Sequence, residues 1–293
     1  MKITNKAGLP EPIVKAATPR DRVIRKDVFY VTELVDSPRI KKLQDDHWPQ
    51  LEEDASDRIW AILGSAVHGV LEKNVGKDEL SEKRVEVEID GCKVTGRMDL
   101  YNPETGTLTD YKFVGVASVF NGLKPEWEKQ LWLYAWMLQK TGHKVTSIKV
   151  TLIFRDWKRM LSMKDPSYPQ TQVVTMTVSL PPMTTLEAYA KERVALHKAH
   201  AERVKGYYDP CTDPERWTKP TTFAVMKGTN KKASRVLPSA KEAEAWKAAQ
   251  EKPGLYNVVH RPGEDTRCLY FCPVRMFCDH GQRLHVSDTS QEE

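Results

Sequence analysis

An antiparallel meander of three strands, predicted between residues 84 and 114, constrains the fold more than any other part of the chain. The pattern of apolar and polar side chains predicts its strands at Arg84–Ile89, Lys93–Leu100 and Thr107–Val114. Asp90-Gly91 is a dipeptide typical of a tight hairpin turn, and residues 102–106 supply a second turn. We therefore expect three neighbouring strands of one sheet.

Two carboxylates and a lysine lie where the second and third predicted strands meet. Asp99 is near the end of one strand, and Asp110 and Lys112 share one face of the next because side chains alternate along a strand. Two carboxylates can hold Mg²⁺ or Mn²⁺ against a phosphate oxygen, and the lysine would stabilise developing negative charge or orient the attacking water. A single D-x-K triplet, however, is more often a solvated face with a surface ion pair.

Two predicted helices flank the meander and carry further polar pairs. Helices are predicted at residues 59–73 and 125–139. His68 and Glu72 lie four residues apart on one face of the first helix, and Gln130 and Tyr134 have the same spacing on the second. Taken alone, a helical histidine is more often a packed core residue than a ligand, and the Gln/Tyr pair is only a polar edge on a buried helix.

Taken together in chain order, these motifs resemble the RecB-like branch of the PD-(D/E)XK nuclease superfamily. They are G-x-x-x-H-x-x-x-E from Gly64 to Glu72, G-x-x-D from Gly96 to Asp99, D-x-K from Asp110 to Lys112, and Q-x-x-x-Y from Gln130 to Tyr134. The resemblance implies a mixed α/β restriction-endonuclease-like core, with a central mixed sheet flanked by helices. It extends to phage exonucleases and to CRISPR-associated RecB-like nucleases.

The resemblance also implies roles for individual residues. The metal ligands that it implies are His68, Asp99, Asp110 and the main-chain carbonyl of Tyr111. Lys112 would be the catalytic lysine, acting with Asp99 and Asp110 on a bound Mg²⁺ or Mn²⁺. Gln130 and Tyr134 would contact the DNA substrate.

The function that we expect is a metal-dependent DNA exonuclease with a preference for single strands or DNA ends, because relatives with the Q-x-x-x-Y motif mostly degrade DNA from ends. Two alternatives stay open: a structure-specific endonuclease acting on flaps or branches, and a non-catalytic DNA-binding subunit of a recombination or CRISPR adaptation complex. The intact set of ligands and Lys112 counts against the non-catalytic alternative. The sequence has no Walker or helicase signature, so a helicase, like a recombinase or a single-strand-binding protein, would be a separate partner.

A cluster of cysteines near the carboxyl end gives a second, less complete resemblance. Cys268, Cys272 and Cys278 resemble the cluster that closes the iron–sulfur nucleases of this branch. Those nucleases usually take a fourth cysteine from a helix near the amino terminus, where this chain has Ser37. Three possibilities follow: a [4Fe–4S] centre completed by Cys211 or a histidine, a zinc site completed by His280, or buried thiols without metal.

Composition sets limits on the compartment and on the partners. The 293 residues are 40% hydrophobic, enough to bury a sizeable core. Five cysteines, an odd number, favour a reducing compartment. We find no apolar run of membrane-spanning length and no signal peptide, so we expect no membrane partner and a cytoplasmic location, in a bacterium or in the host cell of a phage. The net charge of +5 permits a polyanionic partner.

The predicted organisation along the chain has four parts. They are a flexible basic arm (1–27), the nuclease core (28–206), an insertion with a basic loop and a short helix capped by Ser239 (207–262), and the cysteine segment with a tail (263–293). Two further strands at residues 144–154 and 172–180 extend the sheet, and a capping box at Thr184–Glu187 begins a helix that ends at Gly206.

The loop between the last two predicted strands is basic and aromatic. It contains Arg155, Trp157, Lys158 and Arg159. Basic residues interleaved with an aromatic side chain are suited to stacking on a single nucleic-acid strand. A solvent-exposed hairpin end explains the same composition equally well.

Overall fold

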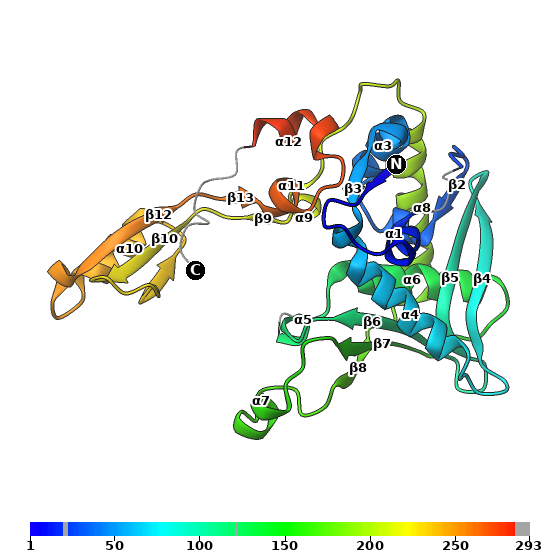
Figure 1. Ribbon diagram of the computed structural model, residues 1–293, viewed down its shortest axis with the longest axis horizontal. Coiled ribbons are helices and arrows are strands. Elements are labelled where there is room, and N and C mark those ends of the chain that lie inside the picture. The colour runs from blue at the N-terminus through cyan, green and yellow to red at the C-terminus, as the bar shows by residue number, and fades with distance from the viewer. Residues whose placement is uncertain (20–22, 121, 285–293) are drawn as a thin grey trace. The chain divides into compact units, whose positions relative to one another are not determined.

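The structure is a computed structural model that describes residues 1–19, 23–120 and 122–284 (Figure 1). The chain divides into two compact units, an amino-terminal unit of residues Met1–Asp209 and a carboxy-terminal unit of residues Pro210–Glu293. Within the described residues, no helix combines the length and the apolar character needed to cross a membrane.

A six-stranded mixed sheet is the centre of the amino-terminal unit. Its strands are β2 (Val28–Tyr30), β4 (Leu80–Ile89), β5 (Cys92–Asn102), β6 (Thr107–Val114), β7 (Ser147–Phe154) and β8 (Val173–Val178). The order is β2-β5-β6-β7-β8, and β4 pairs with the other edge of β5. The β2–β5 and β6–β7 pairs are parallel and the rest are antiparallel. This arrangement, flanked by helices, confirms the predicted mixed α/β fold class.

The meander that the sequence predicted is strands β4, β5 and β6. Asp90 and Gly91 both adopt the left-handed backbone region, with φ of 50° and 74°, as a two-residue hairpin turn of the primed type requires. Strand β4 begins at Leu80, four residues before the predicted start. The alternation of apolar and charged residues does not reach this far back. The ladder keeps its register here but lacks a pair at Glu82, between Ser81–Leu100 and Lys83–Met98.

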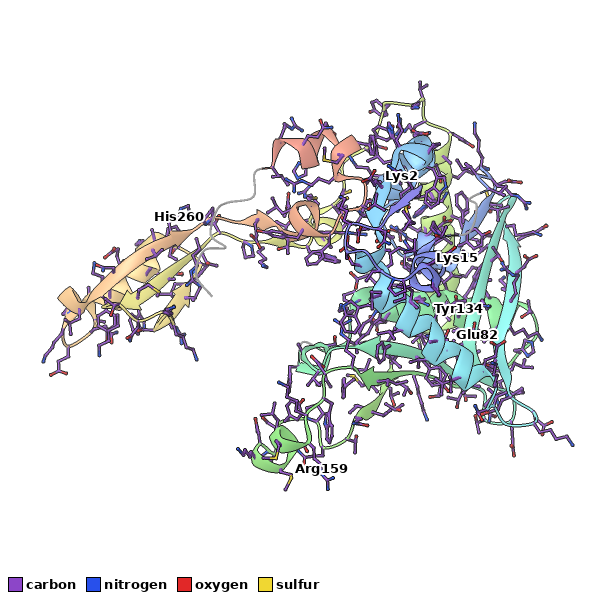
Figure 2. All side chains as sticks on the ribbon, viewed as in Figure 1. Lys2, Lys15, Glu82, Tyr134, Arg159 and His260 are labelled. Carbon is purple, nitrogen blue, oxygen red and sulfur yellow. The ribbon has the colours of Figure 1, made fainter. Side chains whose placement is uncertain are left out.

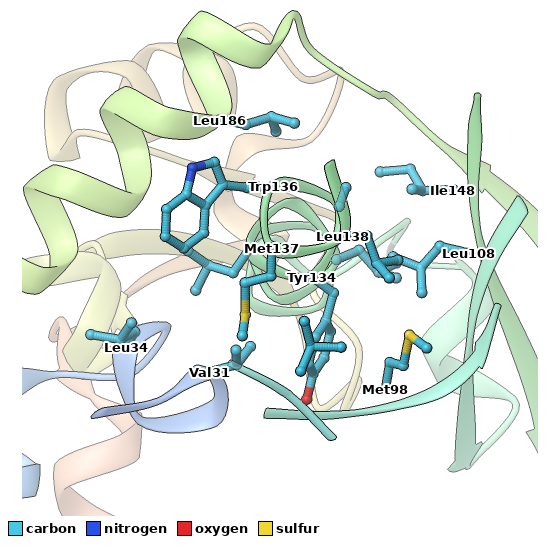
Figure 3. Close-up of a cluster of buried hydrophobic side chains, with 14 of the residues drawn as sticks. Val31, Leu34, Met98, Leu108, Tyr134, Trp136, Met137, Leu138, Ile148 and Leu186 are labelled. Atoms are coloured by element: carbon cyan, nitrogen blue, oxygen red, sulfur yellow. The ribbon is translucent and has the colours of Figure 1, made fainter. Parts of the chain in front are cut away.

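The amino-terminal unit has eight α-helices among its described residues, and α6 packs against the sheet in the main core. They are α1 (Glu11–Ala17), α2 (Val31–Leu34), α3 (Pro38–His47), α4 (Ile59–Glu72), α5 (Ala117–Phe120), α6 (Pro125–Lys140), α7 (Arg159–Lys164) and α8 (Met183–Ala201). Helix α6 is buried at Leu131 and throughout 133–138, the pattern of a helix covered on all sides. Figure 3 shows Trp136 near Leu186 of α8 and Leu138 near Leu108 of β6. Each fully buried large side chain of this kind contributes roughly 1.5–3 kcal/mol.

Helix α8 begins and ends earlier than the sequence predicted. The backbone N–H groups of Thr185 and Leu186 donate to the carbonyl of Pro182 at 2.9 and 3.2 Å, so the first turn starts at Met183. Thr184 therefore lies inside the helix and the predicted capping box is wrong. The helix ends at Ala201 with Glu202 as its C-cap, before the predicted Gly206.

The amino-terminal residues, for which the sequence indicated a flexible arm, contain regular structure. Strand β1 (Lys2–Thr4) pairs in parallel with β3 (Glu52–Asp54), and helix α1 spans Glu11–Ala17. The Asp54 carboxylate accepts hydrogen bonds from the Thr4 hydroxyl and the Lys6 amide, both at 2.8 Å. The amino-terminal segment is thus held by residues 52–54, about 50 positions later in the sequence. Local periodicity cannot predict a contact with so distant a partner.

The carboxy-terminal unit is built on a small antiparallel sheet. Its strands are β10 (Thr222–Lys227), β11 (Arg235–Leu237) and β12 (Tyr256–Arg261), in the order β11-β10-β12. Helix α10 (Ala240–Ala248) adjoins this sheet. The predicted Ser239 cap is present, since its hydroxyl accepts from the Glu242 amide at 3.2 Å. The remaining elements are α9 (Asp213–Arg216), β9 (Thr218–Lys219), β13 (Glu264–Asp265), α11 (Thr266–Tyr270) and α12 (Asp279–Arg283).

Candidate active site

The motif side chains meet at one cavity of about 440 Å³ in the amino-terminal unit. The residues of the sequence motifs that line it are Gly64, His68, Glu72, Asp99, Asp110, Lys112, Gln130 and Tyr134. They come from α4, β5, β6 and α6, elements that are separate in the sequence. Glu82 of β4 lines the same cavity, and Figure 2 shows it together with Tyr134 beside α4.

A gap along one edge of β5 creates this cavity. On that edge β5 pairs with β2 up to Thr95 and with β6 from Leu100 onward. Residues 96–99, the G-x-x-D motif, therefore have no neighbouring strand there among the residues that the structure describes. Instead, the Tyr134 hydroxyl donates to the Arg97 carbonyl at 2.9 Å. The G-x-x-D motif is thus the stretch of β5 whose backbone is contacted by a side chain, that of Tyr134, in place of a neighbouring strand.

Asp99 occupies the end of this gap and bridges the two strands. Its Oδ2 accepts a hydrogen bond of 2.7 Å from the backbone N–H of Tyr111 on β6. That N–H lies beyond the last β5–β6 pair, so a carboxylate takes the place of a ladder carbonyl. Tyr111 is paired with Thr151 of β7, and the role of its carbonyl as a metal ligand stays a prediction.

Asp110, Lys112 and Gln130 form a closed set of polar contacts. The Lys112 ammonium lies 2.9 Å from Asp110 Oδ2 and donates to Gln130 Oε1 at 3.1 Å, and Gln130 Nε2 donates to Asp110 Oδ1 at 3.2 Å. Asp110 is only 3% exposed, and this burial raises its pKa to about 6, against the opposing charge of Lys112. Despite the close ammonium, no hydrogen bond of normal geometry reaches the buried Oδ2 from any described residue.

His68 faces two carboxylates. Its Nδ1 lies 3.4 Å from Asp99 Oδ1 and 3.1 Å from Glu82 Oε1. The hydrogen bond that the His68 ring donates to the Asp99 carboxylate, with a further contribution from Glu82, raises the pKa of His68 to about 9 although burial opposes the charge. The imidazole is therefore protonated at neutral pH in the metal-free protein. The two carboxylates thus favour a positive charge at the position of the His68 ring.

Glu82 is the site residue that the sequence did not reveal. It belongs to no motif and precedes the alternating stretch of β4. Its backbone has φ of 50°, a left-handed conformation that is uncommon for glutamate, in the interruption of the β4–β5 ladder. Glu82 Oε2 also forms an ion pair of 2.7 Å with Arg97. Such strained conformations cluster at functional sites.

The donor atoms of this site fit a divalent metal ion. His68 Nδ1 and the oxygens of Glu82 and Asp99 lie within 4.8 Å of one another. Asp110 adds a buried carboxylate oxygen without a hydrogen bond. Carboxylate oxygens with one imidazole suit Mg²⁺ and Mn²⁺.

Gln130 and Tyr134 both make contacts within the protein. Gln130 holds the Asp110–Lys112 pair, as described above, and still lines the cavity. Tyr134 is 4% exposed, and burial together with the negative charges of Asp99 and Asp110 raises the pKa of its hydroxyl. Their predicted contacts with DNA stay predictions.

The cysteines gather in the carboxy-terminal unit. The ligand atoms of Asp265, Cys268 and His280 lie within 4.8 Å of one another, and His280 Nε2 is 2.6 Å from Asp265. Burial raises the pKa of the Cys268 thiol to about 11, and the negative charges that raise it further are those of Cys272, Asp265, Cys211 and Cys278. Of the four cysteines of this unit, Cys268 is the one whose thiol lies within 4.8 Å of two other possible ligands among the described residues. Ser37 belongs to the other unit, where it is buried.

No protein-family model and no curated protein matches this sequence. Distantly similar solved structures include the following two. The crystal structure of SSO0001 aligns with a TM-score of 0.45 and 18% identity, over 63% of this chain and 84% of that one. A phage-related exonuclease from Haemophilus somnus 129PT aligns with a TM-score of 0.30 and 14% identity, over 57% of this chain and 72% of that one. At these scores and identities the likenesses decide no function, which has to be argued from the site.

Proposed function

We propose that this chain is a metal-dependent deoxyribonuclease of the RecB-like branch of the PD-(D/E)XK superfamily. The observation that carries the proposal is the meeting of His68, Asp99, Asp110 and Lys112, from three separate elements, at one cavity. The reaction is hydrolysis of a phosphodiester bond. The Q-x-x-x-Y motif favours an exonuclease that acts on single strands or DNA ends.

The residues that line the cavity would have separate roles in metal binding and in charge stabilisation. His68, Asp99 and Asp110, with the Tyr111 carbonyl, would hold Mg²⁺ or Mn²⁺. The bound ion supplies a positive charge against the phosphate and makes a water molecule more acidic. Lys112 stabilises negative charge that develops on the phosphate oxygens.

Gln130 and Glu82 position these groups. Gln130 contacts both members of the Asp110–Lys112 pair and so restricts the rotamers of both. Glu82 holds His68 on the side that faces Asp99. Gln130 and Tyr134 are also our candidates for holding the DNA strand, and any helicase, recombinase or single-strand-binding partner would bring that strand to the site.

The test is degradation of single- and double-stranded DNA, labelled at either end, with Mg²⁺ or Mn²⁺. We expect Asp110→Ala and Lys112→Ala to lower cleavage by roughly 10²-fold or more, the scale of losing one preorganised charge-stabilising group. Lys191→Ala is a matched control, because Lys191 is an exposed helical lysine paired with Glu187 away from the cavity. Both active-site variants should keep the wild-type circular dichroism spectrum.

Circular single strands separate the alternatives. Cleavage of circles, which have no ends, would replace the exonuclease by an endonuclease, and flap or branched substrates would then show whether it is structure-specific. Binding of DNA without cleavage by the wild-type protein would favour the accessory-subunit alternative. Wild-type turnover by Lys112→Ala would overturn the mechanism.

We also propose that Cys268, Cys272 and Cys278 hold a structural metal, with Cys211 completing a [4Fe–4S] centre or His280 completing a zinc site. The carboxy-terminal unit has few buried apolar side chains among its described residues: Ala224, Val225, Ala243, Leu269 and Val274, besides two of the cysteines. Small units with so little core usually depend on a metal or on disulfides. Three thiolates with one imidazole suit zinc and four thiolates suit a [4Fe–4S] centre, and metal analysis with visible absorption of the purified protein distinguishes the two. A metal-free protein would overturn the proposal.

A further inference from the structure

An exposed tryptophan stands over an arginine at the end of the strand that carries Asp110 and Lys112. Trp60, near the start of α4, is 53% exposed. The guanidinium carbon of Arg155 lies 4.1 Å from the centre of its ring. The Arg155 amide donates to the Val114 carbonyl at 2.9 Å, which fixes Arg155 at the carboxyl ends of β6 and β7.

The sequence suggested Trp157 as the aromatic side chain that would act with the basic loop. In the structure, Arg155 of this loop contacts Trp60. Trp157 donates its indole N–H to the Pro169 carbonyl at 2.7 Å and packs against the core. Its ring is therefore committed to the fold. The aromatic partner of the basic loop is supplied by α4, from almost a hundred residues earlier in the sequence.

The position of Trp60 relates it to the active-site cavity. Trp60 and Gly64 are four residues apart and so share a face of α4, and Gly64 lines the cavity. His68 follows two turns later, about 12 Å along the helix axis. A stacked strand advances about 3.4 Å per nucleotide, so this distance corresponds to roughly three or four nucleotides.

We infer that Trp60 and Arg155 form a stacking platform for one base of the single strand that enters the active site. This inference rests on the proposed nuclease function. The exposed indole offers an aromatic face, which any base can stack on, and the Arg155 cation neutralises a neighbouring phosphate. A role in the fold alone would need no exposed indole face, and an exposed cation–π pair stabilises a fold only weakly.

Binding is measured with a fluorescent oligothymidine in the presence of EDTA, which prevents cleavage. We expect Trp60→Ala to weaken binding by about 5- to 100-fold, the range measured when an aromatic stacking partner of a base is removed. Trp60→Phe should recover most of the affinity. Val70→Ala is the matched control, since Val70 is 63% exposed on the same helix and does not line the cavity.

A substrate scan locates the platform along the strand. An abasic site placed three or four nucleotides from the scissile bond should weaken binding to the wild-type protein and leave binding to Trp60→Ala unchanged. Affinity of Trp60→Ala within twofold of wild type, or an equal abasic penalty in both proteins, would overturn the platform. Wild-type DNA binding that depends on Trp60 but produces no cleavage would support the platform and refute only the proposed nuclease activity.

Discussion

Gly64 and Gly96 both belong to motifs of the candidate site, but they lie in opposite environments. A Cβ on Gly96 would lie 2.6 Å from Tyr134 Cε1 and 2.8 Å from Val31 Cγ2, so only glycine fits the gap in β5. A Cβ on Gly64 would meet no neighbouring atom within 4 Å among the described residues. Packing therefore explains Gly96. Gly64 lines the cavity, and we attribute the presence of a glycine at this position to close approach of the substrate.

Alanine substitutions should separate these two roles. Gly64→Ala should raise the free energy of unfolding by up to ~1 kcal/mol, because glycine is a poor helix residue, and should lower DNA cleavage. Gly96→Ala should lower the free energy of unfolding by about 1–3 kcal/mol through overpacking against Tyr134. Urea unfolding and the cleavage assay measure both effects. Gly64→Ala with full activity would refute the substrate explanation.

The charge balance around His68 makes the stability of the metal-free protein depend on pH. The pKa of His68 is raised from 6.5 to about 9, chiefly by Asp99. The folded protein therefore keeps a proton that the unfolded chain loses above pH 6.5. The stabilisation is complete below pH 6.5 and is lost as the pH rises to about 9.

We expect the metal-free protein to lose on the order of 2 kcal/mol of stability from this group between about pH 6 and pH 9. Urea unfolding in EDTA across this range measures the loss. His68→Gln should show a flatter pH profile, because it removes the titrating group. The same slope in both proteins would contradict the assignment. Added Mn²⁺ should restore stability most at high pH, where His68 is free to bind.

At the scale of elements, the site depends on how α6 fits against the open edge of β5. Strand β5 has β4 on one side along most of its length, but on the other side it lacks a strand at residues 96–99. Helix α6 brings Tyr134 to this stretch and Gln130 to Asp110 and Lys112. One helix thus both closes the sheet and positions the polar groups of the site.

Tyr134→Phe tests which of these tasks Tyr134 performs. Because the hydroxyl donates to the Arg97 carbonyl in a buried place, its removal should lower the free energy of unfolding by about 1–2 kcal/mol. Because Tyr134 is also our candidate for holding the DNA strand, we expect the affinity for single-stranded DNA to fall as well. Lower stability with unchanged affinity would instead limit Tyr134 to a role in the fold.

For the whole molecule, the two units have different sources of stability. The amino-terminal unit contains a large core that runs from Phe29 to Val194. In the carboxy-terminal unit, the buried residues around Cys268 and Cys278 include few large apolar side chains. A metal held by the cysteines would supply what the core lacks.

Cys268→Ser should remove the proposed metal and unfold the carboxy-terminal unit selectively. Calorimetry should then show one cooperative transition for the amino-terminal unit and a lost or separate transition for the rest. Cys92→Ala is the control, because Cys92 is a buried core residue of β5 in the other unit. Equal metal content and unchanged unfolding in Cys268→Ser would contradict a structural metal.

The sequence by itself determined the features that depend on near neighbours. The turn at Asp90-Gly91, the strands of the meander and the spacing of His68 on its helix follow from local periodicity and turn chemistry. Of the residues predicted for the site, His68, Asp99, Asp110, Lys112, Gln130 and Tyr134 line one cavity, but their meeting there depends on the tertiary fold. Their proposed roles as ligands and catalyst rest on the resemblance and await the cleavage assay.

Only the tertiary structure decided the features that depend on distant partners. Glu82 joins the site through an interruption of the β4–β5 ladder, β1 is held by β3, and Trp60 meets Arg155 across ninety-five positions of the sequence. The predicted cap at Thr184 failed because Pro182 supplies the first carbonyl of the helix. Contacts of this kind leave no periodic signal, since the chain must fold before the partners become neighbours.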